Sequence, residues 1–305
     1  MNDKIDFLLK LFVTIFLLFF LIFKIGLNNI CQAFLTLNIV YLLLIIPVFF
    51  IVFILGAINI IILLTPLNHN LKFSHIFKYY SISWAMGLLT PARLGEFSII
   101  YYFDRHKIGM GPSMAAILLD KVTTTAVYLA IGLLGIILFF YKEDMRIFLI
   151  FLTLYLLIFM MAILVFISET GRNFVKNILK HRANKFAGFS KTVNTYLRKR
   201  MDLVLYNTIL TVIKTLLMSL IAYWLFLGFG VYISFWLVLV VSVLGSIISF
   251  IPISISGLGV RESLVIVLYA KMGIAAPIVF SNYLIMNVLN YGFALFIMGW
   301  VFLEK

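Results

Sequence analysis

Long apolar runs separated by short polar stretches make up most of this chain. Each long run can cross a hydrocarbon core of roughly 30 Å as a helix. The runs contain few of the alternating polar positions that strands of a membrane β-barrel would show. We expect spanning helices at about residues 8–24, 35–64, 113–141, 147–167, 203–229, 232–251 and 277–302. The pattern therefore predicts an all-α, polytopic membrane helix bundle with about seven or eight spanning helices.

Two interruptions break this pattern, and each combines helix-breaking residues with an arginine and a glutamate. The first reads Thr-Pro-Ala-Arg-Leu-Gly-Glu-Phe at residues 90–97, and the second reads Pro-Ile-Ser-Ile-Ser-Gly-Leu-Gly-Val-Arg-Glu at residues 252–262. The apolar pieces around the first, about 75–90 and 94–103, are each too short to span. We prefer a re-entrant hairpin there to one kinked crossing helix, because proline disfavours helix at the residue before it.

The domain organisation follows from these features. We expect a single integral membrane domain over residues 1–305, with re-entrant or broken hairpins at 71–103 and 252–272 that form an internal pseudo-repeat. The first apolar run is expected to be a retained helix rather than a signal peptide, because no small-residue cleavage site follows Lys24.

Composition and charge support a membrane location. The 305 residues are 64% hydrophobic and 11% charged, the mean hydropathy is +1.17, and the net charge is +13. Basic and apolar positions interleave at helical spacing in a basic interfacial segment, residues 170–202, whose residues 172–200 should face an anionic lipid surface. Positively charged loops are cytoplasmic, so we expect a cell-membrane protein with a cytoplasmic N-terminus and a cytoplasmic loop at 168–202. Lipid accounts for the charge, and we expect no nucleic-acid partner.

The sequence lacks the motifs of several enzyme classes. Cys31 is the single cysteine, and the histidines show no metal-ligand spacing. There is no phosphate-binding loop, dinucleotide fingerprint, zinc-protease motif or nucleophile elbow. We therefore expect no catalytic residue, no metal and no cofactor.

The interruptions themselves are the candidate binding site. A broken helix leaves backbone N–H groups that attract phosphate or carboxylate, glycine permits close approach, and arginine makes forked contacts with phosphate. An alternative is that the charge pairs are structural and only hold the hairpins together. Intramembrane polar residues elsewhere complete the candidates for substrate binding, which are Arg93, Gly95, Glu96, Asp120, Lys121, Gly257, Gly259, Arg261, Glu262, Asn287 and Asn290.

These residues carry a resemblance. Pro91-x-Arg93-x-Gly95-Glu96, the Asp120-Lys121 pair and Gly257-Leu258-Gly259-Val260-Arg261-Glu262 resemble the transmembrane region of the lysylphosphatidylglycerol synthase family, the flippase-like domain of the multiple peptide resistance factor. The resemblance implies a helix bundle with re-entrant pieces that handles phospholipid. This sequence departs from the family pattern in two places. The family more often has Glu-Arg where this chain has Asp120-Lys121, and Pro-Gly-Gly where this chain has Ile255-Ser256-Gly257. Because the family's soluble synthase domain is not seen in this sequence, we do not expect the protein to aminoacylate lipid by itself.

Three functional hypotheses remain open at this point. The first is a flippase-like transporter that moves an anionic or aminoacylated phospholipid, such as lysylphosphatidylglycerol, between leaflets. The second is a membrane enzyme, or enzyme subunit, that acts on a lipid-linked sugar or phosphate with Glu96 and Glu262 as acid and base. The third is a scaffold that docks a partner through residues 172–200. Membrane phospholipids are the expected partners, and a second copy of the chain or a separate synthase is a further candidate.

Overall fold

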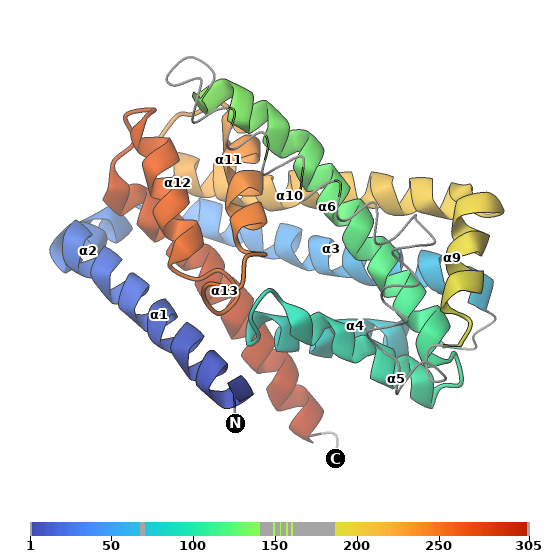
Figure 1. Ribbon diagram of the computed structural model, residues 1–305. Helices are drawn as coiled ribbons and strands as arrows, with labels where there is room; N and C mark the ends of the chain where they lie inside the picture. The colour runs from blue at the N-terminus through green and yellow to red at the C-terminus, as the bar shows by residue number, and fades with distance from the viewer. Residues whose placement is uncertain are drawn as a thin grey trace. The chain divides into compact units, whose positions relative to one another are not determined.

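The apolar runs form long helices in the computed structural model, which describes residues 2–67, 71–140 and 187–303 together with Leu149, Thr153, Leu157 and Met160. The helices are α1 (Asn2–Ile25), α2 (Leu27–Leu35), α3 (Ile39–Leu64), α4 (Phe73–Leu88), α5 (Ile99–Arg105), α6 (Met110–Phe140), α9 (Phe189–Arg198), α10 (Met201–Gly228), α11 (Phe235–Ile248), α12 (Val260–Ala270) and α13 (Ala276–Leu303) (Figure 1). The predicted all-α class is confirmed.

Five helices in the described part of the chain are long and apolar enough to cross a membrane. They are α1, α3, α6, α10 and α13, and they match five of the predicted spans. Large apolar side chains on them face outward, as Phe12 and Phe19 do with 67% of their surface exposed. This is the surface expected of helices in lipid, and it confirms a polytopic membrane protein. The expected span at 147–167 lies outside the described residues, apart from isolated positions.

The span expected at 232–251 is shorter than predicted. The helix there, α11, has 14 residues, which at 1.5 Å per residue is about 21 Å and less than a hydrocarbon core. Its end before Pro252 has a simple cause, since proline disfavours helix at the residue before it and cannot donate a backbone hydrogen bond.

Helices α4 and α5 form a helical hairpin around Pro91. Helix α4 ends at Leu88, a 3₁₀ turn covers Leu94–Ser98, and α5 follows. Two contacts show that the chain reverses direction here. Tyr79 of α4 stacks on Tyr102 with ring centroids 4.9 Å apart, and the Tyr79 hydroxyl lies 2.7 Å from Nε2 of His106. Whether this hairpin enters the membrane and returns stays a prediction.

The chain divides into two compact units. Unit 1 comprises Met1–Val52, Ser81–Glu96 and Thr215–Lys305, and unit 2 comprises Phe53–Tyr80 and Phe97–Lys214. In unit 1, small apolar clusters join α1 and α2 to α13, and α4 to α13. The second interruption and residues 90–96 of the first fall in unit 1, so their geometry can be described together.

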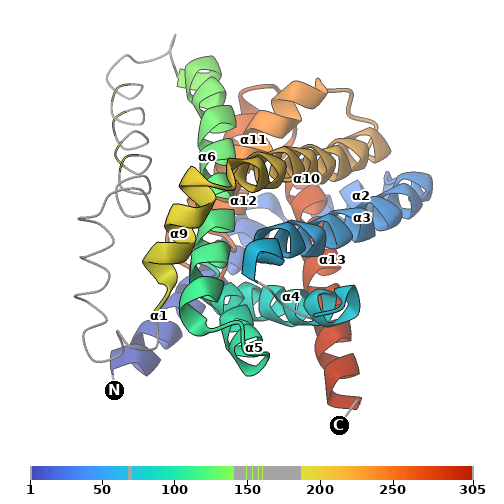
Figure 2. The ribbon, with the colours of Figure 1, turned by 90° about the vertical axis from the view of Figure 1, so that its right-hand side faces the viewer.

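Unit 2 has a larger apolar core, to which α3, α5, α6 and α9 contribute. Helix α9 lies against α6 (Figure 2) and buries Thr192, Val193 and Tyr196, while Lys191 stays exposed. The amphipathic character predicted for 170–202 is therefore present in α9. Residues 170–186 of that segment lie outside the described residues.

Candidate functional site

The second interruption is built by glycines that no other residue could replace without strain. Gly257 and Gly259 have φ of +77° and +82°, in the left-handed region that favours glycine. A Cβ at Gly257 would lie 2.6 Å from Cα of Ser249, and one at Gly259 would lie 2.6 Å from Cβ of Leu17. The loop between α11 and α12 therefore packs directly against the end of α11 and against α1.

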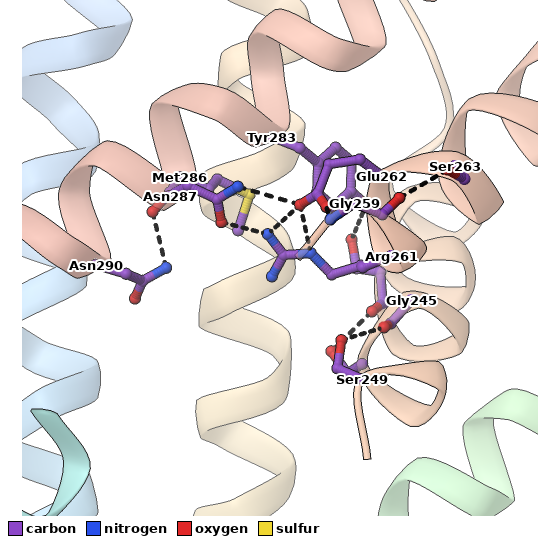
Figure 3. A network of polar contacts seen from close by, with 12 residues as sticks. Gly245, Ser249, Gly259, Arg261, Glu262, Ser263, Tyr283, Met286, Asn287 and Asn290 are labelled. Carbon is purple, nitrogen blue, oxygen red and sulfur yellow. Dashed lines mark hydrogen bonds and ion pairs between the residues drawn. The ribbon is translucent and has the colours of Figure 1, made fainter. Parts of the chain in front are cut away.

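Arg261 and Glu262, at the start of α12, form a hydrogen-bonded pair with Asn287 of α13 (Figure 3). Arg261 donates to Glu262 Oε1 from Nε (3.1 Å) and from Nη2 (2.8 Å). Asn287 accepts from Arg261 Nη2 at 2.5 Å and donates to Glu262 Oε1 at 3.1 Å. The guanidinium also lies over the ring of Tyr283, 5.4 Å from its centroid. These contacts fix the orientation of the arginine.

Glu262 has a second role as the cap of α12. Its Oε2 accepts from the Gly259 N–H at 2.6 Å, a favourable position for a carboxylate at the positive end of a helix. The Arg261 N–H already donates to Gly257 O at 2.9 Å. Backbone donors that the sequence led us to assign to a ligand are thus used within the protein.

Arg261 has a hydrogen-bond donor that a ligand can use, whereas the side chain of Glu262 is buried. The side chain of Glu262 is 1% exposed and that of Arg261 is 16% exposed. Among the described residues, Nη1 of Arg261 has no hydrogen-bond partner, as Figure 3 shows for the nitrogen without a dashed line. A guanidinium held at Nε and Nη2 with Nη1 left over is suited to bind an anion.

The first interruption is held by Thr90 and by the absence of a side chain at Gly95. Thr90 Oγ1 accepts from the Gly95 N–H at 2.7 Å, and a Cβ at Gly95 would collide with the backbone of Met86. Ala92 and Arg93 have φ of +50° and +57°, which is uncommon for residues other than glycine. The Arg93–Glu96 pair is longer and more open than the second pair, with 3.5 Å between Nη1 and Oε1 and an arginine side chain that is 33% exposed.

The two interruptions meet. Pro91 and Ile255 form an isolated antiparallel bridge, and Tyr291 of α13 donates to Leu88 O at 3.1 Å. The hydroxyl of Tyr291 lies within electrostatic range of both Arg93 and Arg261. Thr14 of α1 supports the same point, because its Oγ1 accepts from the Ile255 N–H at 2.9 Å.

Other predicted site residues lie elsewhere. Asn290 donates to Met286 O of its own helix at 2.7 Å rather than to the charged pairs. Asp120 and Lys121 lie in unit 2, where Asp120 contacts Asn59 and Asn207. Sequence reasoning did not single out these two asparagines, although a buried amide within an apolar span was a signal that could have found them.

The model of the family described as lysylphosphatidylglycerol synthase TM region matches residues 7–299. The chain belongs to this family. A search of curated proteins finds no match. Membership in the lysylphosphatidylglycerol synthase TM region family makes this a multi-pass membrane protein related to lipid handling, and the match concerns a transmembrane region rather than a catalytic domain.

Proposed function

We propose that this protein is a flippase-like transporter of the cell membrane that moves a phospholipid between leaflets, with Arg261 as the contact for the lipid phosphate. The observation that carries the proposal is the state of the guanidinium: Nε and Nη2 are held by Glu262 and Asn287, while Nη1 has no partner among the described residues. A guanidinium held in this way loses little conformational freedom when it binds phosphate. The substrate that fits is an anionic or aminoacylated phospholipid.

The meeting of the two interruptions supports transport in particular. Broken helices whose ends converge in one place are a recurrent arrangement at the substrate sites of transporters. Here the bridge between Pro91 and Ile255 brings both broken segments together, with one arginine in each. Arg93 is proposed as a second contact along the headgroup path, because its side chain is the more exposed of the two.

The burial of Glu262 argues against the enzymatic alternative at this position. A general acid or base must come within hydrogen-bond reach of the substrate. Glu262 uses Oε1 for Arg261 and Asn287 and Oε2 for Gly259, and its side chain is 1% exposed. Holding the arginine and capping α12 account for its contacts.

Transfer between leaflets in liposomes tests the proposal. Fluorescent phosphatidylglycerol and its lysylated form are reconstituted with the protein, and a reductant that does not cross the membrane bleaches the outer leaflet. We expect Arg261→Ala to slow transfer about 10- to 100-fold, the loss of a charged hydrogen bond worth roughly 1.5–3 kcal/mol. Arg105→Ala is the matched control, because the exposed Arg105 contacts Tyr101 of its own helix. Equal transfer by the wild type, the Arg261→Ala variant and the control variant would refute the role of Arg261.

A further inference from the structure

A second polar cluster lies within unit 2, where α3, α6 and α10 contact one another. We call it the Asp120 cluster, and it consists of Asn59, Asp120, Thr123, Asn207 and Thr211, each at most 7% exposed. Asp120 Oδ1 accepts from Nδ2 of Asn59 and from Nδ2 of Asn207, both at 3.1 Å. Nδ2 of Asn59 also donates to Thr211 Oγ1 at 3.2 Å, and Thr123 Oγ1 donates to Asn207 Oδ1. The cluster is rich in oxygen atoms and sits within three apolar spans.

One oxygen of the cluster lacks a hydrogen-bond partner among the described residues, and a second has a distant charged partner. Asn59 Oδ1 is buried and has no hydrogen-bond partner among the described residues, a situation that costs free energy inside a protein. Asp120 Oδ2 has Lys121 Nζ at 3.9 Å, beyond hydrogen-bond distance. Glu262, by contrast, has its arginine at 2.8 Å. Within the described chain, the charged partner of Asp120 is therefore more distant than that of Glu262.

Among the described residues that contact Asp120, one carries a positive charge. Lys121 is the charged neighbour in contact with it on α6. Helices α3 and α10 face it with uncharged side chains, those of Asn59 and Asn207. The side chains that α5 adds to the core around α6 are apolar, as Ile99 and Phe103 are. On α9, the hydroxyl of Tyr196 donates to Leu63 O.

We propose that the Asp120 cluster binds a small monovalent cation, either a proton or Na⁺. Rotation of the Asn59 amide by half a turn, an exchange of its O and N positions, places Oδ1 between Asp120 and Thr211. There it accepts a hydrogen bond from a protonated Asp120, or it joins the carboxylate and hydroxyl oxygens as a ligand of Na⁺, a hard cation. Either cation neutralises a carboxylate at membrane depth, where ionisable residues are costly and commonly carry ions. The site stands without the proposed function; if the protein moves lipid, the cation is a candidate driving ion.

Two measurements on the purified full-length protein in detergent test this site, and neither involves lipid. The first is infrared difference spectroscopy of carboxyl protonation as pH is lowered, and the second is equilibrium binding of ²²Na⁺ with choline replacing sodium. For a proton site, we expect a protonated-carboxyl band that is present in the wild type and in Asp104→Asn and absent from Asp120→Asn. For a sodium site, we expect saturable ²²Na⁺ binding that Asp120→Asn weakens by about tenfold or more and Asp104→Asn leaves unchanged.

A further variant keeps the test decisive if Asp120→Asn does not fold. Asn59→Leu retains the carboxylate and removes the amide, so we expect it to weaken ²²Na⁺ binding or to reduce the protonated-carboxyl band. A carboxyl spectrum without a contribution from Asp120, together with no saturable ²²Na⁺ binding, would overturn the proposal and leave the cluster as a structural contact between the three helices. Loss of lipid transfer without loss of cation binding would not count against the Asp120 cluster, because we propose that transfer depends on Arg261.

Discussion

Pro91 and Ile255 are paired across an isolated antiparallel bridge, although they belong to interruptions near opposite ends of the chain. The bridge shows that the two breaks in the apolar pattern form one structural feature. Each break carries an arginine a few residues further on, and Tyr291 lies within electrostatic range of both arginines. The pairing of Pro91 with Ile255 therefore brings the two charged motifs together in one unit.

Cross-linking tests this pairing directly. Partners in an antiparallel bridge have Cα atoms about 4.5–5.5 Å apart, within the range of roughly 4.4–6.8 Å that a disulfide needs. In a Cys31→Ser background, Pro91→Cys with Ile255→Cys should form an intrachain disulfide on mild oxidation, measured as loss of reactive thiols. Pro91→Cys with Ile253→Cys is the control, because Ile253 is two residues from the bridge partner of Pro91. Equal oxidation of both pairs would count against the bridge.

A substitution at Ser256 tests the backbone of the second interruption. Ser256 has φ of +50°, a conformation that costs a residue with a side chain about 1–2 kcal/mol, and the family resemblance leads us to expect glycine here. Ser256→Gly should leave the thermal unfolding temperature unchanged or raise it, since the relief of strain is partly offset by the entropy of glycine. Ser256→Val should lower it. The opposite order would contradict the described backbone.

The close contact at Gly95 predicts a difference between two glycine substitutions. Gly95→Ala places a Cβ against the Met86 backbone, which cannot move as a flexible side chain can, so we expect a loss of roughly 1–3 kcal/mol. Gly299→Ala meets no atom within 4 Å in the described structure and should be neutral or slightly stabilising, because alanine favours helix. Thermal unfolding in detergent compares them, and similar losses at both positions would contradict the account.

Substitution of the two glutamates by glutamine should lower the stability of the protein by different amounts. Glu262→Gln removes the charge that balances Arg261 and weakens the α12 cap, and breaking a buried pair costs about 3–5 kcal/mol. Glu96 pairs with Arg93 at 3.5 Å and its side chain is 13% exposed, so Glu96→Gln should cost less than Glu262→Gln. Chemical denaturation with a tryptophan fluorescence readout distinguishes these values. A larger loss at Glu96 than at Glu262 would reverse the assigned roles.

Much of the fold could be predicted because membrane helices follow from long apolar runs. Pro91, Pro252 and the glycines also marked the breaks, since their effects on the backbone are local. The shortness of α11 was missed because its apolar run continues past the point where Pro252 ends the helix. Partners distant in sequence were harder: nothing near Asn287 indicates that it contacts Arg261, and nothing near Asp120 points to Asn207. Local patterns locate costly residues, and the tertiary fold decides which of them meet.

The position of a bound lipid phosphate tests the central claim most directly. The measurement is a structure of the protein in nanodiscs of phosphatidylglycerol, with the Arg261→Ala variant prepared in the same way. Our account predicts phosphate density within hydrogen-bond distance of Arg261 Nη1 in the wild type and its loss in the variant. A well-ordered lipid bound elsewhere, with Nη1 of Arg261 contacting only protein or water, would contradict it.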